Sequence, residues 1–277
     1  PGWMFEMIEE NEQIAKESGA RIVFSCGFDS IPFDLGVLFL QNAVTERFGK
    51  PANRVRGRVR AMNGEFSGGT VASMTATMAT LKNKPELIKV LVNPFSLSGG
   101  FTGPDQLDDS KPLFDKKLEM WVSPFIMASI NTKNIHRSNF LMNHSYGKDF
   151  CYDEMTIAGP GDEGKASAEL MASVNPLAAD DAPSPGEGPS KESRERGNYD
   201  LLFCADLLTG ETVNATVTGD MDPGYGSTSK MIAESALCLI KDCEELQGGI
   251  YTPAPSMGTK LITRLEKNAG LSFSVEE

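Results

Sequence analysis

The sequence contains few of the side chains from which metal sites and disulfide frameworks are built. Its 277 residues include five cysteines, with no CxxC spacing, and only two histidines, His136 and His144. An odd number of cysteines argues against a disulfide framework, and two histidines argue against a histidine-based zinc site. We therefore expect no metal centre and a reducing, cytoplasmic setting.

Long apolar runs, excess basic charge and several catalytic signatures are also absent. No apolar run approaches the roughly 20 residues that a membrane span needs. The 26 basic and 38 acidic residues give a net charge of −12, which disfavours nucleic acid and anionic membranes as partners. There is no GK[ST] phosphate loop, GxSxG elbow or HExxH pair. An enzyme without an evident nucleophile, metal or base usually takes its chemistry from a cofactor.

The patterns that are present indicate an α/β protein. A hydrophobic content of 40% and a charged content of 23% are ordinary for a globular chain with a sizeable core. Helix, strand and helix alternate at the start, as in a doubly wound sheet. Further strands and helices follow, including a hairpin joined at Thr209-Gly210. The helices are expected over residues 3–18, 33–48, 85–92, 124–142, 164–174 and 227–241, and the strands over 21–25, 54–63, 150–158, 201–208 and 211–219.

The stretch 19–37, GARIVFSCGFDSIPFDLGV, predicts a strand, a tight turn and a helix in close succession. The strand, Arg21–Ser25, is expected to be covered on both faces, because a short β-branched apolar run is typical of parallel sheets. Gly27 suits a sharp turn, and the helix is expected to open at Pro32, a residue that fits a first helical turn.

Side chains in this turn lie where α/β proteins hold their ligands. Ligands of open sheets sit outside the carboxyl ends of strands and beside helix N-termini, and Cys26, Asp29 and Ser30 occupy such a position. Asp29 or Ser30 could instead cap the following helix, and Cys26 could be a buried, inert thiol. On the residues alone, the segment is either a ligand site or an ordinary strand-to-helix turn.

Three glycine-rich segments precede expected helices. Gly68-Gly69 breaks a strand before a helix that starts at Thr70, where backbone N–H groups can hold an anion or be capped. The small residues of that helix suggest close packing against another backbone. The one GxGxxG, residues 159–164, carries two acidic residues where a pyrophosphate would lie, so we interpret it as a turn. DPGYG, residues 222–226, is a second glycine-rich turn before a helix.

Residues 54–63 predict a strand with one basic face. Arginines at positions 54, 56, 58 and 60 alternate with Val55, Gly57, Val59 and Ala61, which is the period of a β-strand. The basic face is either solvated surface or a place where the arginines meet acidic groups of another subunit or a carboxylate ligand.

Three other segments bear on a binding site. The helix expected over 124–142 is richer in polar residues than packing requires, so part of it either faces a cleft or is solvated surface. Residues 175–198, rich in proline, serine, glycine and charge, are expected to form a flexible loop that could act as a lid. Residues 94–119 are turn-rich, and we expect a mobile excursion there.

Four motifs occur in order: GFDSIPFDLG (27–36), GEFSGGTVAS (64–73), GEGPSKESRERG (186–197) and DPGYGSTSKMIAESALCL (222–239). Together they resemble the saccharopine dehydrogenase-like oxidoreductases, including the branch called trans-acting enoyl reductases. The resemblance covers nearly the whole chain. Phe33 departs from the pattern, which has a small residue at that position.

The resemblance implies the terminal piece of a Rossmann-type parallel sheet over residues 1–50, followed by a mixed, largely antiparallel α+β substrate and dimerisation domain over 51–277. The chain starts at Pro1 within a helical pattern, so we expect the rest of the Rossmann domain, with its phosphate loop, to be absent and this fragment alone to be inactive. The implied reaction is hydride transfer between NAD or NADP and a C=N or C=C bond of a small, lipid-like substrate.

The resemblance also implies roles for particular residues. Asp29 and Ser30 are expected to be the catalytic, orienting groups. The residues expected to contact the nicotinamide cofactor are Cys26, Gly27, Phe28 and Asp29. Those expected to contact substrate are Gly68, Gly69, Thr70, Arg137 and Tyr225.

Two other functions stay open at this point. The chain could be a non-catalytic module for dimerisation or lipid contact, with residues 54–60 and 124–142 as its interface. It could also bind carboxylates without redox chemistry, through the Arg56–Arg60 face. In each case we expect no nucleic-acid partner and no transmembrane segment, and a homodimer is expected.

Overall fold

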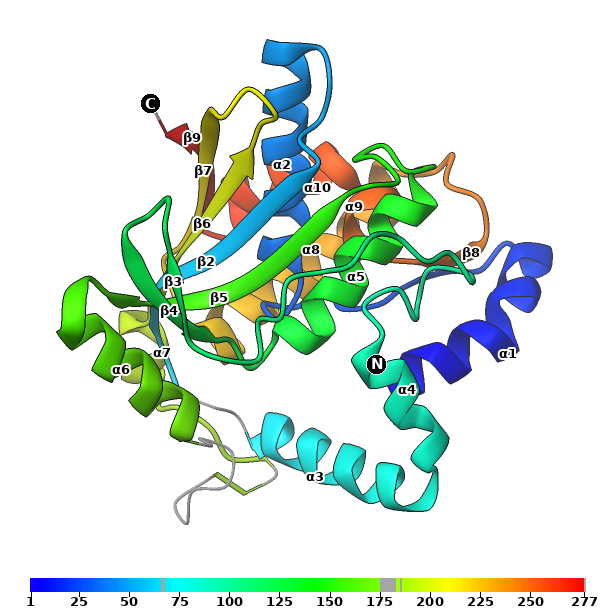
Figure 1. Cartoon of the computed structure of the whole chain (residues 1–277). Coiled ribbons are helices and arrows are strands. Elements are labelled where there is room, and N and C mark those ends of the chain that lie inside the picture. Colours follow the sequence, from blue (N-terminus) through cyan, green and yellow to red (C-terminus); the bar gives the residue numbers. More distant parts are fainter. Residues whose placement is uncertain (66–67, 175–182, 185, 277) are drawn as a thin grey trace.

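A seven-stranded mixed sheet forms one layer of the computed structural model, which describes residues 1–65, 68–174, 183–184 and 186–276 (Figure 1). β2 and β5 are parallel, and the other neighbouring strands are antiparallel. The α/β fold class is therefore confirmed. The strands in spatial order are β3 (Leu113–Asp115), β4 (Met120–Pro124), β5 (Cys151–Gly159), β2 (Arg54–Asn63), β6 (Asn198–Asp206), β7 (Thr212–Gly219) and β9 (Leu271–Glu276).

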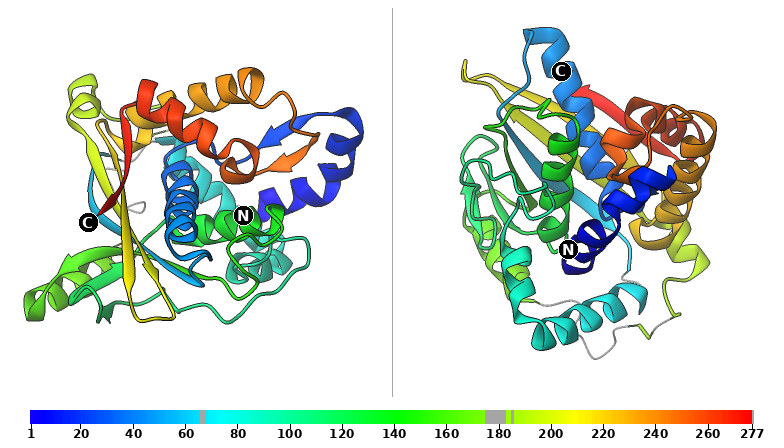
Figure 2. Two further views of the ribbon diagram at one scale, coloured as in Figure 1. Left: turned by 90° about the horizontal axis from the view of Figure 1, so that it is seen from above. Right: turned by 90° about the vertical axis from the view of Figure 1, so that its right-hand side faces the viewer.

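Helices gather on one side of this sheet and form the main core with it (Figure 2). Alternation along β2, β6 and β7 directs Val55, Leu201 and Val217 into that core, and all three are fully buried. The helices are α2 (Ile31–Phe48), α5 (Ala128–Leu141), α8 (Thr228–Lys241), α9 (Pro253–Ser256) and α10 (Gly258–Asn268). α6 (Gly161–Ser173) packs against β4 and β5, where the Ser123 hydroxyl donates to the Ala168 carbonyl over 3.0 Å.

A smaller parallel pair, β1 (Arg21–Val23) and β8 (Gly249–Tyr251), lies beside α1 (Gly2–Ser18) (Figure 1). The prediction that the strand at residues 21–25 is covered on both faces is wrong. Ile22 is 39% exposed, so one face of this strand reaches solvent. Around this pair lies a small separate core of Met4, Ile8, Ala15, Phe24, Leu97 and Ile250.

The two predicted parts of the chain are interleaved. α2, from residues 1–50, is packed into the core of the seven-stranded sheet, while β8, from residues 51–277, pairs with β1. A domain boundary near residue 50 therefore stays a prediction.

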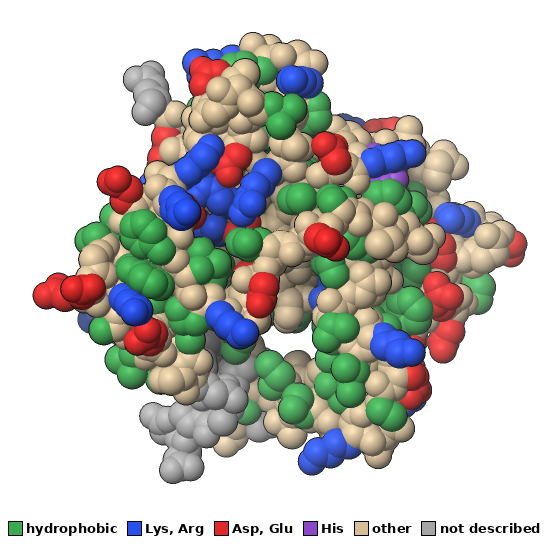
Figure 3. Space-filling model, viewed as in Figure 1, with side chains coloured by type: hydrophobic (Ala, Val, Ile, Leu, Met, Phe, Trp, Pro, Cys, Tyr) green, Lys and Arg blue, Asp and Glu red, His purple; other side chains and the backbone are tan. Residues whose placement is uncertain are grey.

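Helix α3 (Gly68–Asn83) is exposed along almost its whole length, and an opening separates it from the body of the molecule (Figure 3). Of its described residues, Gly68 alone is buried. The prediction that its small side chains pack closely against another backbone is therefore wrong. The helix is held at its ends, by the Gly68 N–H on the Glu187 carbonyl and by η1 (Pro85–Leu87), which precedes α4 (Ile88–Val92).

The segment 94–119 is irregular except for β3, but it is anchored to the body of the protein. Phe95 and Leu97 are buried there. In the segment predicted to be a lid, residues 175–182 and 185 lie outside the described residues. The part that follows forms α7 (Lys191–Arg196), capped by the Ser190 hydroxyl. Within the described ranges, none of the helices combines the length and the apolar character that crossing a membrane requires.

Candidate functional site

The turn that follows β1 is held by the start of α8. The Phe28 N–H donates to Thr228 Oγ1 over 2.9 Å, and a Cβ at Gly27 would lie 3.1 Å from the Thr228 methyl carbon. A side chain at position 27 would therefore press on Thr228, and glycine avoids this contact. The left-handed backbone conformation falls instead on Ser25, whose φ is 60°. The turn therefore has a fixed shape set by α8 on one side and β1 on the other.

A chain of buried polar side chains runs beneath the turn. Ser30 Oγ donates to Asn131 Oδ1 (2.9 Å), and Asn131 Nδ2 donates to Glu154 Oε1 (2.8 Å). The Tyr152 hydroxyl donates to the other carboxyl oxygen of Glu154 (2.7 Å), and Asn134 Nδ2 donates to Ser30 Oγ (2.7 Å). Each of these residues is at most 1% exposed. The network fixes the turn on α5 and β5.

Glu154 is the titratable carboxyl of this network. Burial raises its pKa to about 8, although the hydrogen bonds from Tyr152 and Asn131 act in the opposite direction. Near neutral pH the buried carboxyl therefore stays largely protonated, which removes the cost of an isolated charge in the core.

A groove with about 500 Å³ of empty space, partly open to solvent, lies beside the turn. Most of its wall is apolar, and three polar side chains stand among the apolar ones, as is typical of small-molecule sites. The lining residues are Phe28, Asp29, Met62, Gly64, Glu65, Thr70, Phe125, Ile126, Met127, Pro223 and Gly224.

Two segments beside the groove, at Gly68 and at Tyr225, are both hydrogen-bonded to the backbone carbonyl of Glu187. This oxygen accepts hydrogen bonds from the Gly68 N–H (3.0 Å) and from the Tyr225 hydroxyl (3.1 Å). Asp222 caps η3 (Pro223–Ser227) by accepting from the N–H groups of Tyr225 and Gly226. Tyr225 therefore positions the edge of the groove, whereas the adjacent Gly224 lines it.

The structure brings together Phe28, Asp29 and Thr70 among the predicted site residues. Ser30 lies beneath the turn and reaches the groove only through its neighbours. The predicted residues that do not line the groove are Cys26, Gly27, Ser30, Gly68, Gly69, Arg137 and Tyr225. Burial raises the pKa of the Cys26 thiol to about 11, so Cys26 is an unreactive thiol at neutral pH.

Asp29 is the exposed acid of the turn. The protein around it raises the pKa of its carboxyl above the ordinary value, because the charged form is partly withdrawn from water. An acid of this kind, at the wall of an apolar groove, keeps its proton to a higher pH than a free aspartate does.

Arg137 is held in a structural position, which corrects its prediction as a substrate contact. It is 2% exposed, donates to the carbonyls of Leu97 and Ile250, and pairs with Glu12 over 3.1 Å. These bonds join α5 to α1, β8 and the irregular segment. Most other polar residues of α5 are likewise buried, so much of the polar density in this helix belongs to a buried network.

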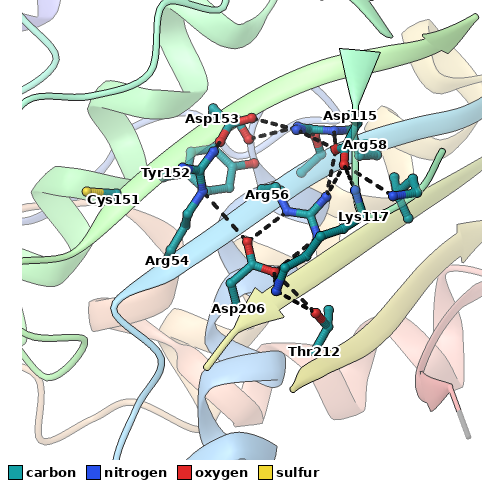
Figure 4. Close-up of polar contacts among 12 residues, drawn as sticks. Arg54, Arg56, Arg58, Asp115, Lys117, Cys151, Tyr152, Asp153, Asp206 and Thr212 are labelled. Atoms are coloured by element: carbon teal, nitrogen blue, oxygen red, sulfur yellow. Dashed lines mark hydrogen bonds and ion pairs between the residues drawn. The ribbon is translucent and has the colours of Figure 1, made fainter. Parts of the chain in front are cut away.

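The basic face of β2 is neutralised within the chain itself (Figure 4). Arg56 and Arg58, 4% and 1% exposed, both bind Asp115, at 2.6 to 3.1 Å. Arg56 also pairs with Asp206 (3.0 Å) and Arg58 with Asp153 (2.7 Å). The two central arginines are therefore neither solvated surface nor available to an incoming carboxylate.

A second cavity, with about 1460 Å³ of empty space partly open to solvent, lies between α5, β5 and the segment 91–110. Lys133 lines it, is 3% exposed and donates to the Ser129 carbonyl over 2.7 Å. Burial lowers the pKa of Lys133 to about 8. The prediction that part of the helix over residues 124–142 faces a cleft is confirmed here, because Ser129, Thr132 and Lys133 line this cavity.

The fold is that of an α/β protein, and its groove lies beside the carboxyl end of a parallel strand. No protein-family model matches the chain. Over 299 aligned residues it is 34% identical to a Mycobacterium tuberculosis protein named "Putative trans-acting enoyl reductase", covering 99% of this chain and 71% of that protein. It is 31% identical to the trans-acting enoyl reductase of Mycobacterium leprae, covering 93% of this chain and 68% of the relative. It is 32% identical to the trans-acting enoyl reductase of Mycobacterium ulcerans, covering 91% of this chain and 66% of that relative.

The chain therefore belongs to the trans-acting enoyl reductase family.

Proposed function

We propose that the chain carries the substrate side of an NAD(P)H-dependent enoyl reductase, which transfers a hydride to the C=C bond of an α,β-unsaturated acyl substrate. The observation that carries the proposal is the position of Phe28 and Asp29. They follow a parallel strand and line an apolar groove, in a chain of this family. The names of the relatives favour a C=C acceptor over the C=N acceptor of saccharopine dehydrogenase-like chemistry.

The nicotinamide end of the cofactor fits the residues at the turn. Dinucleotides bind at the carboxyl ends of parallel strands, and the wall around Asp29 is apolar, as a flat ring requires. Phe28 and Asp29 would hold the ring, with Cys26 and Gly27 behind them. Bound there, NAD(P)H would supply the hydride.

The pyrophosphate needs a different site. A Cβ at Gly164 would lie 2.1 Å from the Gly159 carbonyl oxygen, so the GxGxxG segment at 159–164 serves strand-to-helix packing. We propose that residues outside this sequence extend the β1–β8 pair and supply the phosphate loop. Residues 1–50, with β8, would then complete a Rossmann-type domain of the saccharopine dehydrogenase-like kind, and the chain alone would bind the cofactor weakly.

The chain's own residues would orient the reactants and manage the proton. The apolar groove would exclude water from the acyl chain, and the Ser30–Asn131–Glu154 network would keep the turn in one position. Hydride addition to one carbon of the double bond leaves the neighbouring carbon to take a proton. Asp29, with its raised pKa, would deliver that proton.

Replacing Asp29 by asparagine is expected to lower kcat about 100-fold with little change in KM, because general acid catalysis is worth at least that much. Activity of the unmodified protein should fall as pH rises through the raised pKa of Asp29, and Asp29→Asn should lose this dependence. The measurement is NADPH-dependent reduction of crotonyl thioester across pH. Glu65→Gln, at the other acid of the groove, is the control. An unchanged kcat in Asp29→Asn would rule out its role as the acid.

We also propose a cytoplasmic setting and a homodimer. The five cysteines are free, and Ile232 and Ile240 on α8 are 56% and 65% exposed, as at a surface that a second copy covers. Light scattering is expected to give the mass of a dimer. A monomer at micromolar concentration would contradict this part of the proposal.

A further inference from the structure

The groove and the second cavity share one wall. Of the described residues that line the groove, Phe125 alone also lines the cavity. It is followed by Ile126 and Met127 on the groove side, while Pro124 and Ala128 face the cavity. Phe125 is 7% exposed and is the residue at which the linings of the two hollows meet.

Phe33 supports this wall from behind. It is 1% exposed and lines neither hollow, and its ring centroid lies 5.7 Å from that of Phe125 and 5.8 Å from that of Phe28. On its other side lies Phe203, at 6.3 Å. Two groove-lining aromatic rings therefore pack on this one buried ring, and Phe28 also packs on Tyr199, at 4.7 Å. Rings at these separations in tilted or edge-to-face arrangements attract one another beyond simple burial.

We propose that Phe33 determines the length of acyl chain that the groove accepts, by keeping Phe125 in place as a partition between the groove and the second cavity. This inference rests on the proposed enoyl reductase function. With Phe33 present, an acyl chain ends against Phe125. The cavity beyond is lined in part by apolar side chains suited to the end of a longer chain, namely Leu91, Val92, Pro94, Phe95 and Leu107.

A smaller residue at position 33 removes the support. A smaller side chain leaves a vacated volume behind Phe125, and the Phe125 ring can move into it. When the ring moves back, the groove opens into the cavity and a longer chain fits. The departure of Phe33 from the small residue of the resembling motif thus becomes a determinant of specificity.

The test compares Phe33→Ala and Phe33→Leu with the unmodified protein on crotonyl, octenoyl and dodecenoyl thioesters, with NADPH. The ratio of kcat/KM for dodecenoyl over crotonyl thioester is expected to rise at least ~10-fold in Phe33→Ala and by less in Phe33→Leu, since each accommodated methylene adds binding energy. Phe39→Leu is the matched control, because Phe39 is on the same helix but packs on Phe273. Phe33→Leu carries the test if Phe33→Ala fails to fold.

A binding measurement separates this inference from the proposed function. Displacement of the fluorescent probe cis-parinaric acid by hexanoic and tetradecanoic acids requires no turnover. A shift toward the longer acid in the Phe33 variants and not in Phe39→Leu supports the partition, even if no enoyl thioester is reduced. An unchanged chain-length preference in both assays overturns it. Absence of turnover in every protein, each produced from its complete reading frame and with probe binding intact, would overturn the reductase proposal alone.

Discussion

Replacing Asp115 by alanine is expected to lower the free energy of unfolding by about 3–5 kcal/mol, the usual cost of leaving a buried ion pair without one partner. Asp115 is the shared carboxylate of Arg56 and Arg58, and all three side chains are at most 5% exposed. Asp206 and Asp153 remain beside the two guanidinium groups, but neither can move to replace a carboxylate that lies between them. Chemical denaturation followed by circular dichroism measures the loss.

The same contacts predict the response to acid. Burial alone would raise the pKa of Asp115, but the Arg56 and Arg58 guanidinium groups lower it below the ordinary value. The stabilisation is therefore present above the unfolded-state pKa and is lost as pH falls through the lower folded-state pKa. The Asp115→Ala variant should lack this part of the acid sensitivity.

A matched control is the exposed pair at the end of the same strand. Arg60 and Asp200, whose side chains are 30% and 35% exposed, are 3.0 Å apart. Asp200→Asn is expected to cost at most about 1 kcal/mol, because solvent screens an exposed ion pair. Equal losses in Asp115→Ala and Asp200→Asn would show that the buried cluster contributes nothing beyond surface charge.

Replacing Glu154 by glutamine is expected to stabilise the protein at alkaline pH by about 5 kcal/mol, the free energy that corresponds to raising the pKa from 4.5 to about 8. Glutamine can still accept a hydrogen bond from Asn131 with its carbonyl oxygen. Its amide can donate to the Tyr152 hydroxyl. The variant therefore keeps the network and removes the charge.

The sign follows from proton binding. Between pH 4.5 and about 8 the folded protein keeps the Glu154 proton that the unfolded chain has released, so unfolding is favoured as pH rises. The difference in free energy of unfolding between Glu154→Gln and the unmodified protein should grow across this window and level off above it. The other titrating groups are present in both proteins, so their contributions cancel when one free energy of unfolding is subtracted from the other.

Denaturation at several pH values between 5 and about 9 measures this difference, and Glu163→Gln, at an exposed acid in the first turn of α6, is the control. A difference that stays flat across the window would show that Glu154 is ionised in the folded protein. The hydrogen bonds from Asn131 and Tyr152 would then outweigh the effect of burial.

Local sequence patterns predicted helices and strands better than they predicted which side chains meet in the folded protein. The period of two over residues 54–63 is enough to predict β2 and to place its arginines on one face. The partners of Arg54, Arg56 and Arg58 come from three other strands; they are Asp115, Asp153 and Asp206. Their meeting depends on the strand order β3-β4-β5-β2-β6, which no local window contains.

The same limit applies to the candidate site. The segment 27–36 and the glycines before Thr70 pointed to one edge of the groove, because glycine-rich turns before helices are recognisable in a sequence. Phe125, Ile126 and Met127 were missed, since apolar side chains in a groove wall have the same composition as a core. Arg137 misled us because a buried polar network and a cleft require the same residue types.

Isotope transfer tests the central claim most directly. The protein, produced from its complete reading frame, is mixed with crotonyl thioester and NADPH deuterated at the hydride-donating carbon, and the product is examined by mass spectrometry. We predict one deuterium on the carbon farther from the carbonyl, formed about 100-fold more slowly by Asp29→Asn. The experiment is run with NADPH deuterated on one face of the nicotinamide ring and again with NADPH deuterated on the other face. If neither gives a labelled product, although the protein binds acyl chains, the chain is not the substrate side of an enoyl reductase.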